Sequence, residues 1–429
     1  MVTTIDFITF IISFLIILKT INRIFRGRIN IYTILTLIFW LFQFPSLVID
    51  HVVKDSFTVF EDAKNMHSAL TDSTVAILYD FIILSILLFF YKKSLKQGYS
   101  RLNDLICYMK NLQFGTFTNI ILVILMLLPI PGIILAPDPS IYFKWAYTYR
   151  YNISFVSELY HDIVMGNLIM LSFFSWVLYS IQKKHNNLFT YIILFFLTWI
   201  SFKRTILVFG CLSLIFFYFF KGSFSTKPLK TILKAICLLV LCVGYFIYYS
   251  INTGKQSDVP FYYTYTLYYS RHYCLKTAIY DQLQGMSMLE YRGQSILFDM
   301  FFFIPREYWP DKPNVFTSSF TNYCKDLSYD HMTTTFYYAN IWSEFVANFH
   351  IIGIFLSLLL ICLIIRISER SNSIYAYMFG CLFIIFYLFW GIQPFTMIIL
   401  SCWYFFLTYG YITKLLKKGC RYPYKKIKS

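Results

Sequence analysis

Residues 75–91 read VAILYDFIILSILLFFY, an apolar run in which Asp80 is the one charged side chain. Its length approaches the ~20 residues that cross about 30 Å of hydrocarbon as a helix. A helix is the natural structure for such a run, because it satisfies its own backbone hydrogen bonds in lipid. The stretch therefore predicts a transmembrane helix. The cost of burying Asp80 predicts that this carboxylate meets a polar partner between helices.

Similar apolar runs recur along the 429 residues and produce a composition that is 58% hydrophobic and 14% charged. Ordinary soluble domains have about 45–50% apolar and about 25% charged residues. We predict an all-α polytopic membrane protein with about 11 transmembrane helices and a large external loop between spans 8 and 9. The predicted spans are residues 4–21, 30–50, 75–91, 113–136, 162–181, 188–202, 205–220, 231–251, 346–366, 374–390 and 395–413.

Two local features refine this topology. The segment Met1–Asp6 carries no positive charge of the kind found at the start of a cleaved signal peptide, so the first span is expected to be retained. Lys203 and Arg204 lie between the sixth and seventh predicted spans, which favours a tight hairpin over one long helix. At that turn the two cations either snorkel to the membrane surface or serve a function.

The distribution of Lys and Arg predicts the orientation. Connections on one side carry 24 of the 37 basic residues against two acids, Asp104 and Glu369. That side is expected to be cytoplasmic, with the N-terminus outside and the C-terminal tail inside. The net charge of +16 is then a topology signal and a contact with anionic membrane lipid, not evidence for nucleic acid. The chain divides into a helical bundle (1–251), an external loop (252–345) and C-terminal helices with a basic tail (346–429).

The external loop holds the polar and aromatic residues that the spans lack. A guanidinium grips phosphate oxygens bidentately, and Tyr or Trp offers a flat apolar face with one polar handle. The combination suits a ligand with phosphate and sugar, while a solvated loop with an interfacial Tyr belt explains the same composition. The loop residues that could form such a site are Arg271, His272, Arg292, Arg306, Tyr308, Trp309, Lys312, His331 and Glu344.

Several catalytic patterns are absent from the sequence. It contains no phosphate-binding Gly-rich loop, no GxSxG, no HExxH or CxxC metal pattern and no Asp-x-Asp pair. No metal and no cofactor are therefore expected. Since nucleotide donors are not supplied on the outer side, a lipid-linked donor is favoured. Cys274 and Cys324 pair only if the loop faces an oxidising compartment, which the sequence leaves open.

Two runs in the loop resemble the Wzy-type O-antigen polymerases, a family of oligosaccharide repeat-unit polymerases. They are FIPREYWPDKP at 303–313 and WSEFVANFHIIG at 342–353, and the turn SFKRT at 201–205 is similar to the family's Ser-x-x-Arg-Thr turn. In the family, a Pro-Arg…Trp-Pro-x-Lys-Pro stretch precedes a Glu-x-x-x-Asn-x-x-x-x-Gly stretch that opens the next span.

The resemblance implies a metal-independent glycosyltransferase of the C type. It would join undecaprenyl-pyrophosphate-linked oligosaccharides, as donor and acceptor, at the periplasmic face of the bacterial inner membrane. Its essential Arg residues map here to Arg204, Arg271, Arg306 and, more weakly, Arg292. Fixed guanidinium groups suit a leaving pyrophosphate whose charge grows as the bond breaks. Glu344 is expected at the entry of the ninth span, and it ranks before His272 and His331 as the base for the acceptor hydroxyl. A separate chain-length regulator is an implied partner.

Other functions remain open. An O-antigen ligase shares the topology but transfers to the lipid A core, and the Trp-Pro-x-Lys-Pro run favours a polymerase instead. A flippase or exporter of the same lipid-linked sugar predicts charged residues inside the spans, where the sequence shows few beyond Asp80. A purely structural role leaves the polar loop unexplained.

Overall fold

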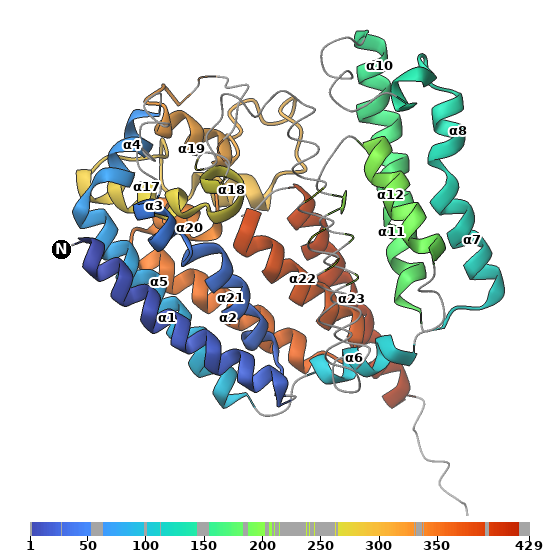
Figure 1. Ribbon diagram of the computed structural model, residues 1–429, viewed down its shortest axis with the longest axis horizontal. Helices are drawn as coiled ribbons and strands as arrows, with labels where there is room; N and C mark the ends of the chain where they lie inside the picture. Colours follow the sequence, from blue (N-terminus) through green and yellow to red (C-terminus); the bar gives the residue numbers. More distant parts are fainter. Residues whose placement is uncertain are drawn as a thin grey trace, which may run out of the picture. The chain divides into compact units, whose positions relative to one another are not determined.

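The computed structural model is all-helical in the part of the chain that it describes (Figure 1). The described residues are 2–26, 28–52, 63–97, 101–111, 113–143, 154–182, 188–201, 265–329, 331, 337, 339–390 and 394–419, with single positions between 206 and 262. The chain forms two compact units, of which the first joins Met1–Asn103 to Pro260–Ser429 and the second is Asp104–Val259. This division follows packing, whereas the three segments predicted from the sequence follow topology and stay a prediction.

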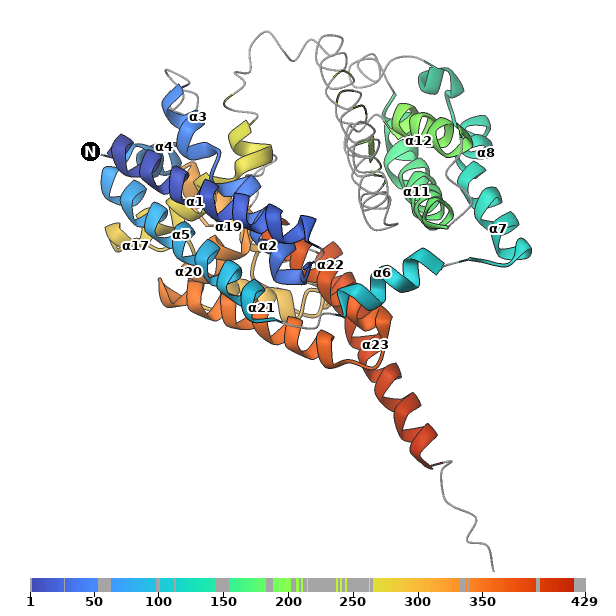
Figure 2. The same cartoon turned by 60° about the horizontal axis from the view of Figure 1, so that its bottom comes forward.

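The N-terminal part of the first unit packs long helices side by side (Figures 1 and 2). Its elements are α1 (Val2–Phe25), α2 (Ile31–Gln43), α3 (Ser46–Val52), α4 (Lys64–Thr71) and α5 (Ser73–Lys96). α2 ends before Pro45, which has no backbone N–H to continue the helix, and α3 begins directly after it. α5 begins at Asp72, whose carboxylate accepts hydrogen bonds from the backbone N–H groups of Thr74 and Val75.

Much of the predicted external loop folds as short helices of the same unit. We call residues 265–331 the cap; its elements are η4 (Tyr265–Ser270), α17 (His272–Gln284), α18 (Gln294–Met300) and α19 (Phe316–Cys324). α17 packs against α4, α5 and α20 (Ile341–Phe349), and every residue from His272 to Ile279 is buried. A fully solvated loop is therefore wrong as a description of α17.

The C-terminal helices complete the first unit. After α20 come α21 (Ile352–Arg370), α22 (Ile374–Trp390) and α23 (Pro394–Gly419). The predicted ninth span, 346–366, is wrong at its start: α20 ends at Phe349, and α21 begins at Ile352. The backbone turns at His350, which has a positive φ of 56°. Gly353 then packs against the Phe345 carbonyl so closely that a Cβ atom would lie 2.0 Å from its oxygen.

An aromatic contact in the core connects helices that are distant in sequence. The Phe39 ring of α2 meets Phe90 of α5 and Trp342 of α20 edge-on, with centroids 5.9 and 5.8 Å apart. All three side chains are buried. Such edge-to-face pairs add about 0.5–1.5 kcal/mol to the area that they bury. The contact fixes the start of α20 against the N-terminal helices.

The second unit has its own core. Its described elements include α7 (Thr116–Leu127), α8 (Pro129–Ile134), η2 (Pro139–Phe143), α10 (Phe155–Tyr160), η3 (His161–Met165), α11 (Gly166–Ile181) and α12 (Leu188–Ser201), while α6 (Leu102–Asn111) begins in the first unit. The buried Trp176 of α11 donates a hydrogen bond from Nε1 to the Thr190 carbonyl of α12, at 2.6 Å. Ser172 of α11 bonds the Met126 carbonyl of α7 in the same way.

Within the described residues, seven helices are long and apolar enough to cross a membrane: Thr4–Ile24, Ile31–Val52, Ser73–Lys96, Thr116–Ile134, Phe155–Ser180, Ile352–Arg370 and Thr396–Lys414. Two shorter apolar helices, Phe189–Ser201 and Ile374–Leu388, match further predicted spans. The predicted spans 205–220 and 231–251 fall where only single positions are described. These helices are those expected of a multi-pass membrane protein, while the total of about 11 and the orientation stay predictions.

Candidate functional site

Glu344 lies in the first turn of α20, and its surroundings hold it in one orientation. Asn340 caps the helix, because its side-chain oxygen accepts a hydrogen bond from Ser343 N at 3.0 Å. Ser295 of α18 donates from Oγ to Glu344 Oε1, at 2.9 Å. Asn348, one turn later on α20, donates from Nδ2 to Ser295 Oγ at 2.8 Å. Glu344 is 1% exposed, so it is an oriented carboxylate in a dry site.

A second carboxyl group lies beside Glu344. Asp299 of α18 is 3% exposed, and burial raises its pKa well above the ordinary range, with the neighbouring Glu344 as the next cause. Two carboxylates this close cannot both ionise easily, so the pair is expected to share one proton. The phenol of Tyr387 on α22 is also near both carboxyl groups. We call Glu344, Asp299, Ser295 and Asn348 the Glu344 site.

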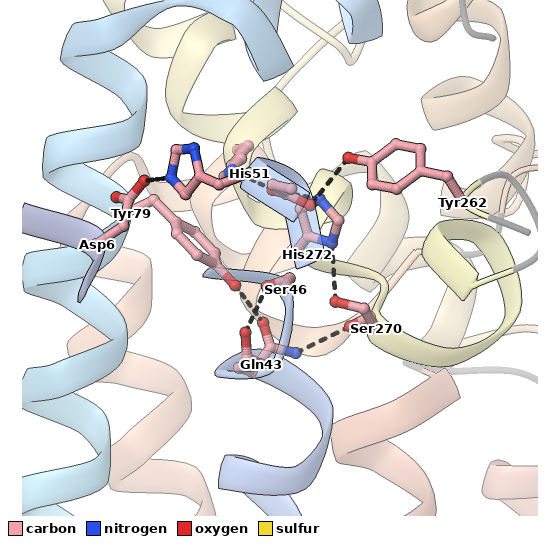
Figure 3. Close-up of polar contacts among 10 residues, drawn as sticks. Asp6, Gln43, Ser46, His51, Tyr79, Tyr262, Ser270 and His272 are labelled. Atoms are coloured by element: carbon pink, nitrogen blue, oxygen red, sulfur yellow. Dashed lines mark hydrogen bonds and ion pairs between the residues drawn. The ribbon is translucent and has the colours of Figure 1, made fainter. Parts of the chain in front are cut away.

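A second polar cluster surrounds Asp50 at the end of α3 (Figure 3). Lys276 Nζ of α17 lies 3.3 Å from Asp50 Oδ2, and His272 Nε2 lies 3.4 Å from the same oxygen. Tyr262 donates from its hydroxyl to Asp50 Oδ1 at 3.0 Å. Ser270 Oγ lies 2.8 Å from His272 Nδ1 on the other side of the ring. We call these five residues the Asp50 cluster.

The Asp50 cluster places Ser, His and Asp in a row, but His272 is a weak base, which argues against an activated serine nucleophile. His272 is fully buried and Ser270 is 1% exposed. Burial lowers the pKa of His272 to about 4, an effect larger than the opposing influence of Asp50. The ring is therefore neutral at physiological pH, and this arrangement orients α17 against α3 more readily than it attacks a substrate.

Further polar contacts extend the cluster toward α1 and α5 (Figure 3). The Tyr79 hydroxyl of α5 donates to Gln43 Oε1 at 2.9 Å, and Gln43 Nε2 donates to the Ser270 carbonyl at 3.4 Å. His51 of α3 pairs with Asp6 of α1. Gln43 is positioned for these contacts because α2 ends at this residue. The network therefore joins four helices and the cap within the first unit.

Arg306 and Lys312 bind the backbone of their own loop. Arg306 donates to the carbonyls of Lys312 (2.7 Å) and Pro313 (3.3 Å) and to Asn314 Oδ1 (2.8 Å). Lys312 donates from Nζ to the carbonyls of Phe302 and Ile304, at 2.7 and 2.8 Å. The two cations therefore shape residues 302–314, whether or not Arg306, which lies on an exposed stretch, also meets a substrate.

The other predicted site residues are scattered over the cap. Arg271 has a left-handed backbone (φ 49°) and a side chain that is 8% exposed. Tyr308 is 82% exposed, and Trp309 packs edge-on against Phe301. Arg292 and His331 are exposed. Arg204 lies outside the described residues.

The two cysteines of the cap, Cys274 and Cys324, are both buried, and no disulfide joins them. Burial raises the pKa of Cys274 to about 12, and it also raises that of Cys324, to which Cys274 adds a smaller effect. The thiols are therefore close enough to influence one another but are not joined.

Sequence reasoning found Glu344 and His272 but missed their partners. Asp299 and Ser295 precede the first motif and belong to no recognised pattern, whereas Asn348 is the Asn of the quoted Glu-x-x-x-Asn run. That i, i+4 spacing was a usable signal, because such residues share one helix face. Over the described residues, no group of three His, Cys, Asp or Glu side chains is placed to hold a metal ion.

Comparison with known proteins adds no relative to this picture. The chain matches no protein-family model, no curated protein and no solved structure.

Proposed function

We propose that the chain is a membrane-embedded glycosyltransferase that polymerises undecaprenyl-pyrophosphate-linked oligosaccharide repeats into O-antigen or a related surface polysaccharide. The observation that carries the proposal is the Glu344 site: an oriented carboxylate beside a carboxyl group that keeps its proton. The two sequence motifs that resemble the Wzy-type polymerases support it, because one contains Glu344 and the other shapes the loop that follows α18.

The proposed reaction needs a base and a stabilised leaving group. Glu344 accepts the proton of the acceptor sugar hydroxyl. That oxygen bonds to the anomeric carbon of the donor chain as the bond from this carbon to the pyrophosphate breaks. Lipid pyrophosphate leaves with the electron pair, and Arg side chains of the cap, Arg271 and Arg306 first, offset its growing charge. The proposal places this chemistry at the periplasmic face of the bacterial inner membrane, with the N-terminus outside and a chain-length regulator as partner.

A gene deletion with lipopolysaccharide profiling tests the proposal. Loss of a polymerase leaves core that carries a single repeat, and the wild-type gene restores the ladder. Glu344→Gln keeps the size of the side chain but removes the base, so we expect a single repeat at unchanged protein level. Glu307→Gln, an exposed acid on the cap, is the matched control and should restore the ladder. Bare core in the deletion strain would refute the polymerase.

Bare core would instead fit a ligase or a flippase, and one observation favours the flippase. The sequence argument against transport was the scarcity of ionisable residues in the spans. The structure brings the carboxyl groups of Asp6, Asp50 and Asp80 together at neighbouring helices. Loss of a flippase would make lipid-linked repeats accumulate on the cytoplasmic side of the membrane, whereas loss of a ligase would not.

A further inference from the structure

Three helices of the first unit bring buried carboxyl groups to the same end of the bundle. Asp6 lies near the start of α1, Asp50 near the end of α3, and Asp80 about two turns inside α5. Asp6 is 7% exposed and Asp80 is 2% exposed, and the side chain of Asp50 is 7% exposed. Carboxylates buried within apolar helices are costly unless cations or protons neutralise them.

Two of the three carboxyl groups form an ion pair in the described part of the chain. Lys276 pairs with Asp50, and His51 pairs with Asp6. His272 also faces Asp50 but is neutral, because burial lowers its pKa to about 4. The other titratable side chains around the cluster are phenols, which add no charge at neutral pH; they are Tyr79, Tyr262 and Tyr265. Neither of the two ion pairs includes the third carboxyl group.

Asp80 is that carboxyl group. Both of its oxygens are buried, and neither meets a donor at good hydrogen-bond geometry in the described part of the chain. Asp6 and Thr9 of α1 are polar neighbours of Asp80, and Lys276 acts on it more weakly than Asp6 does. Two ionised carboxylates offer only acceptors to each other. A bond between Asp80 and Asp6 therefore requires a proton between them.

We propose that Asp6 and Asp80 form a proton-binding pair. The pair holds one exchangeable proton, which reaches it through His51. The side chain of His51 is 27% exposed, while that of Asp6 behind it is 10% exposed. His51 contacts Asp6 (Figure 3), and it is thus the open end of a path that continues through Asp6 to the enclosed Asp80. Lys276 and Asp50 provide a fixed ion pair beside this path. The site is independent of glycosyl transfer at Glu344.

Infrared difference spectroscopy of the purified full-length protein in nanodiscs tests the pair. A protonated carboxyl group gives a carbonyl stretching band that disappears on ionisation. We expect the wild-type protein to show a carboxyl band that titrates with bulk pH, and Asp80→Asn to lose one carboxyl group from that signal. Bands from Asp281 and Asp299 are present in both proteins and cancel in the comparison. Asp72→Asn, which keeps the cap at the start of the same helix, should match the wild type.

The result that overturns the proposal is a titrating band of equal size in the wild-type protein and in Asp80→Asn. If Asp80→Asn does not fold, Asp6→Asn provides the same test. The new amide can donate to Asp80 without a proton between the two side chains, so the contribution of this pair to the band should vanish. A band that persists unchanged in Asp6→Asn would show that no proton is shared between these helices.

Discussion

Gly353→Ala should misplace the catalytic carboxylate that we propose, although the substitution adds a single methyl group. A Cβ at this position lies 2.0 Å from the Phe345 oxygen, 2.3 Å from its carbonyl carbon and 2.9 Å from the Val346 nitrogen. All three are backbone atoms, so no rotamer change relieves the clash. Even to reach a tight contact of about 3 Å, α20 and α21 must separate by about 1 Å.

The energetic cost follows from this displacement. Overpacking of this kind costs about 3 kcal/mol, and alanine returns about 0.5–1 kcal/mol because it favours a helix over glycine. We expect a net loss of about 2 kcal/mol in unfolding free energy, measured by detergent-induced unfolding in mixed micelles. Because Glu344 directly precedes Phe345, chain extension should fall on the order of 100-fold, the usual effect of a misplacement of about 1 Å.

Gly166→Ala is the matched control. Gly166 also lies in a helix, but its nearest neighbour to a new Cβ is the His161 oxygen at 3.5 Å, an ordinary contact. This variant should be unchanged or more stable by up to about 1 kcal/mol. If Gly353→Ala proves as stable as Gly166→Ala and keeps the polysaccharide ladder, the close packing of α20 on α21 is wrong.

Three further predictions concern the cap and α20. Asn340→Ala removes the helix cap of α20 and should lower the free energy of unfolding by about 1 kcal/mol, whereas Asn340→Ser should retain most of it. Lys312→Met removes two hydrogen bonds to carbonyls and should cost about 2 kcal/mol, and proteolysis should then cut residues 302–314 faster. Burial raises the pKa of Asp281 to about 7, above the ~3.9 of an unfolded chain, so the folded state binds the extra proton between these values. Stability should therefore fall as pH rises from about 4 to about 7, and Asp281→Asn should flatten that part of the profile.

Much of the helical architecture could be predicted from hydropathy. The run around Asp80 is a helix, as expected. Asp6 and Thr9 of α1 are its polar neighbours, but the predicted polar partner stays a prediction, because neither Asp80 oxygen accepts a hydrogen bond among the described residues. The start of the ninth span could not be predicted, because residues 346–349 (VANF) are mostly apolar and contain no proline that would mark a break. The break depends on the positive φ of His350 and the close approach at Gly353, which are tertiary features.

The candidate site was predictable only in part. Glu344 was found because it belongs to a motif, but Asp299 is brought to it by the packing of α18 on α20, which no local pattern encodes. Arg306 and Lys312 illustrate the opposite case. Their charge suggested phosphate binding, yet the structure shows both donating to carbonyls of their own loop. A cation in a polar loop can bind a phosphate or donate to carbonyls of its own loop, and the sequence alone does not distinguish the two roles.

The interrupted first unit has a consequence for biogenesis. A ribosome that has completed the N-terminal helices has already delivered Asp6, Asp50 and Asp80 to the membrane, but Lys276 lies almost two hundred residues further on. During that interval the carboxyl groups lack their fixed counter-ion, and α4 and α5 lack α17, which packs against both of them. We therefore expect the early helices to remain loosely associated until the cap is made. Insertion factors or proteases that recognise polar residues in lipid would act on this chain in that window.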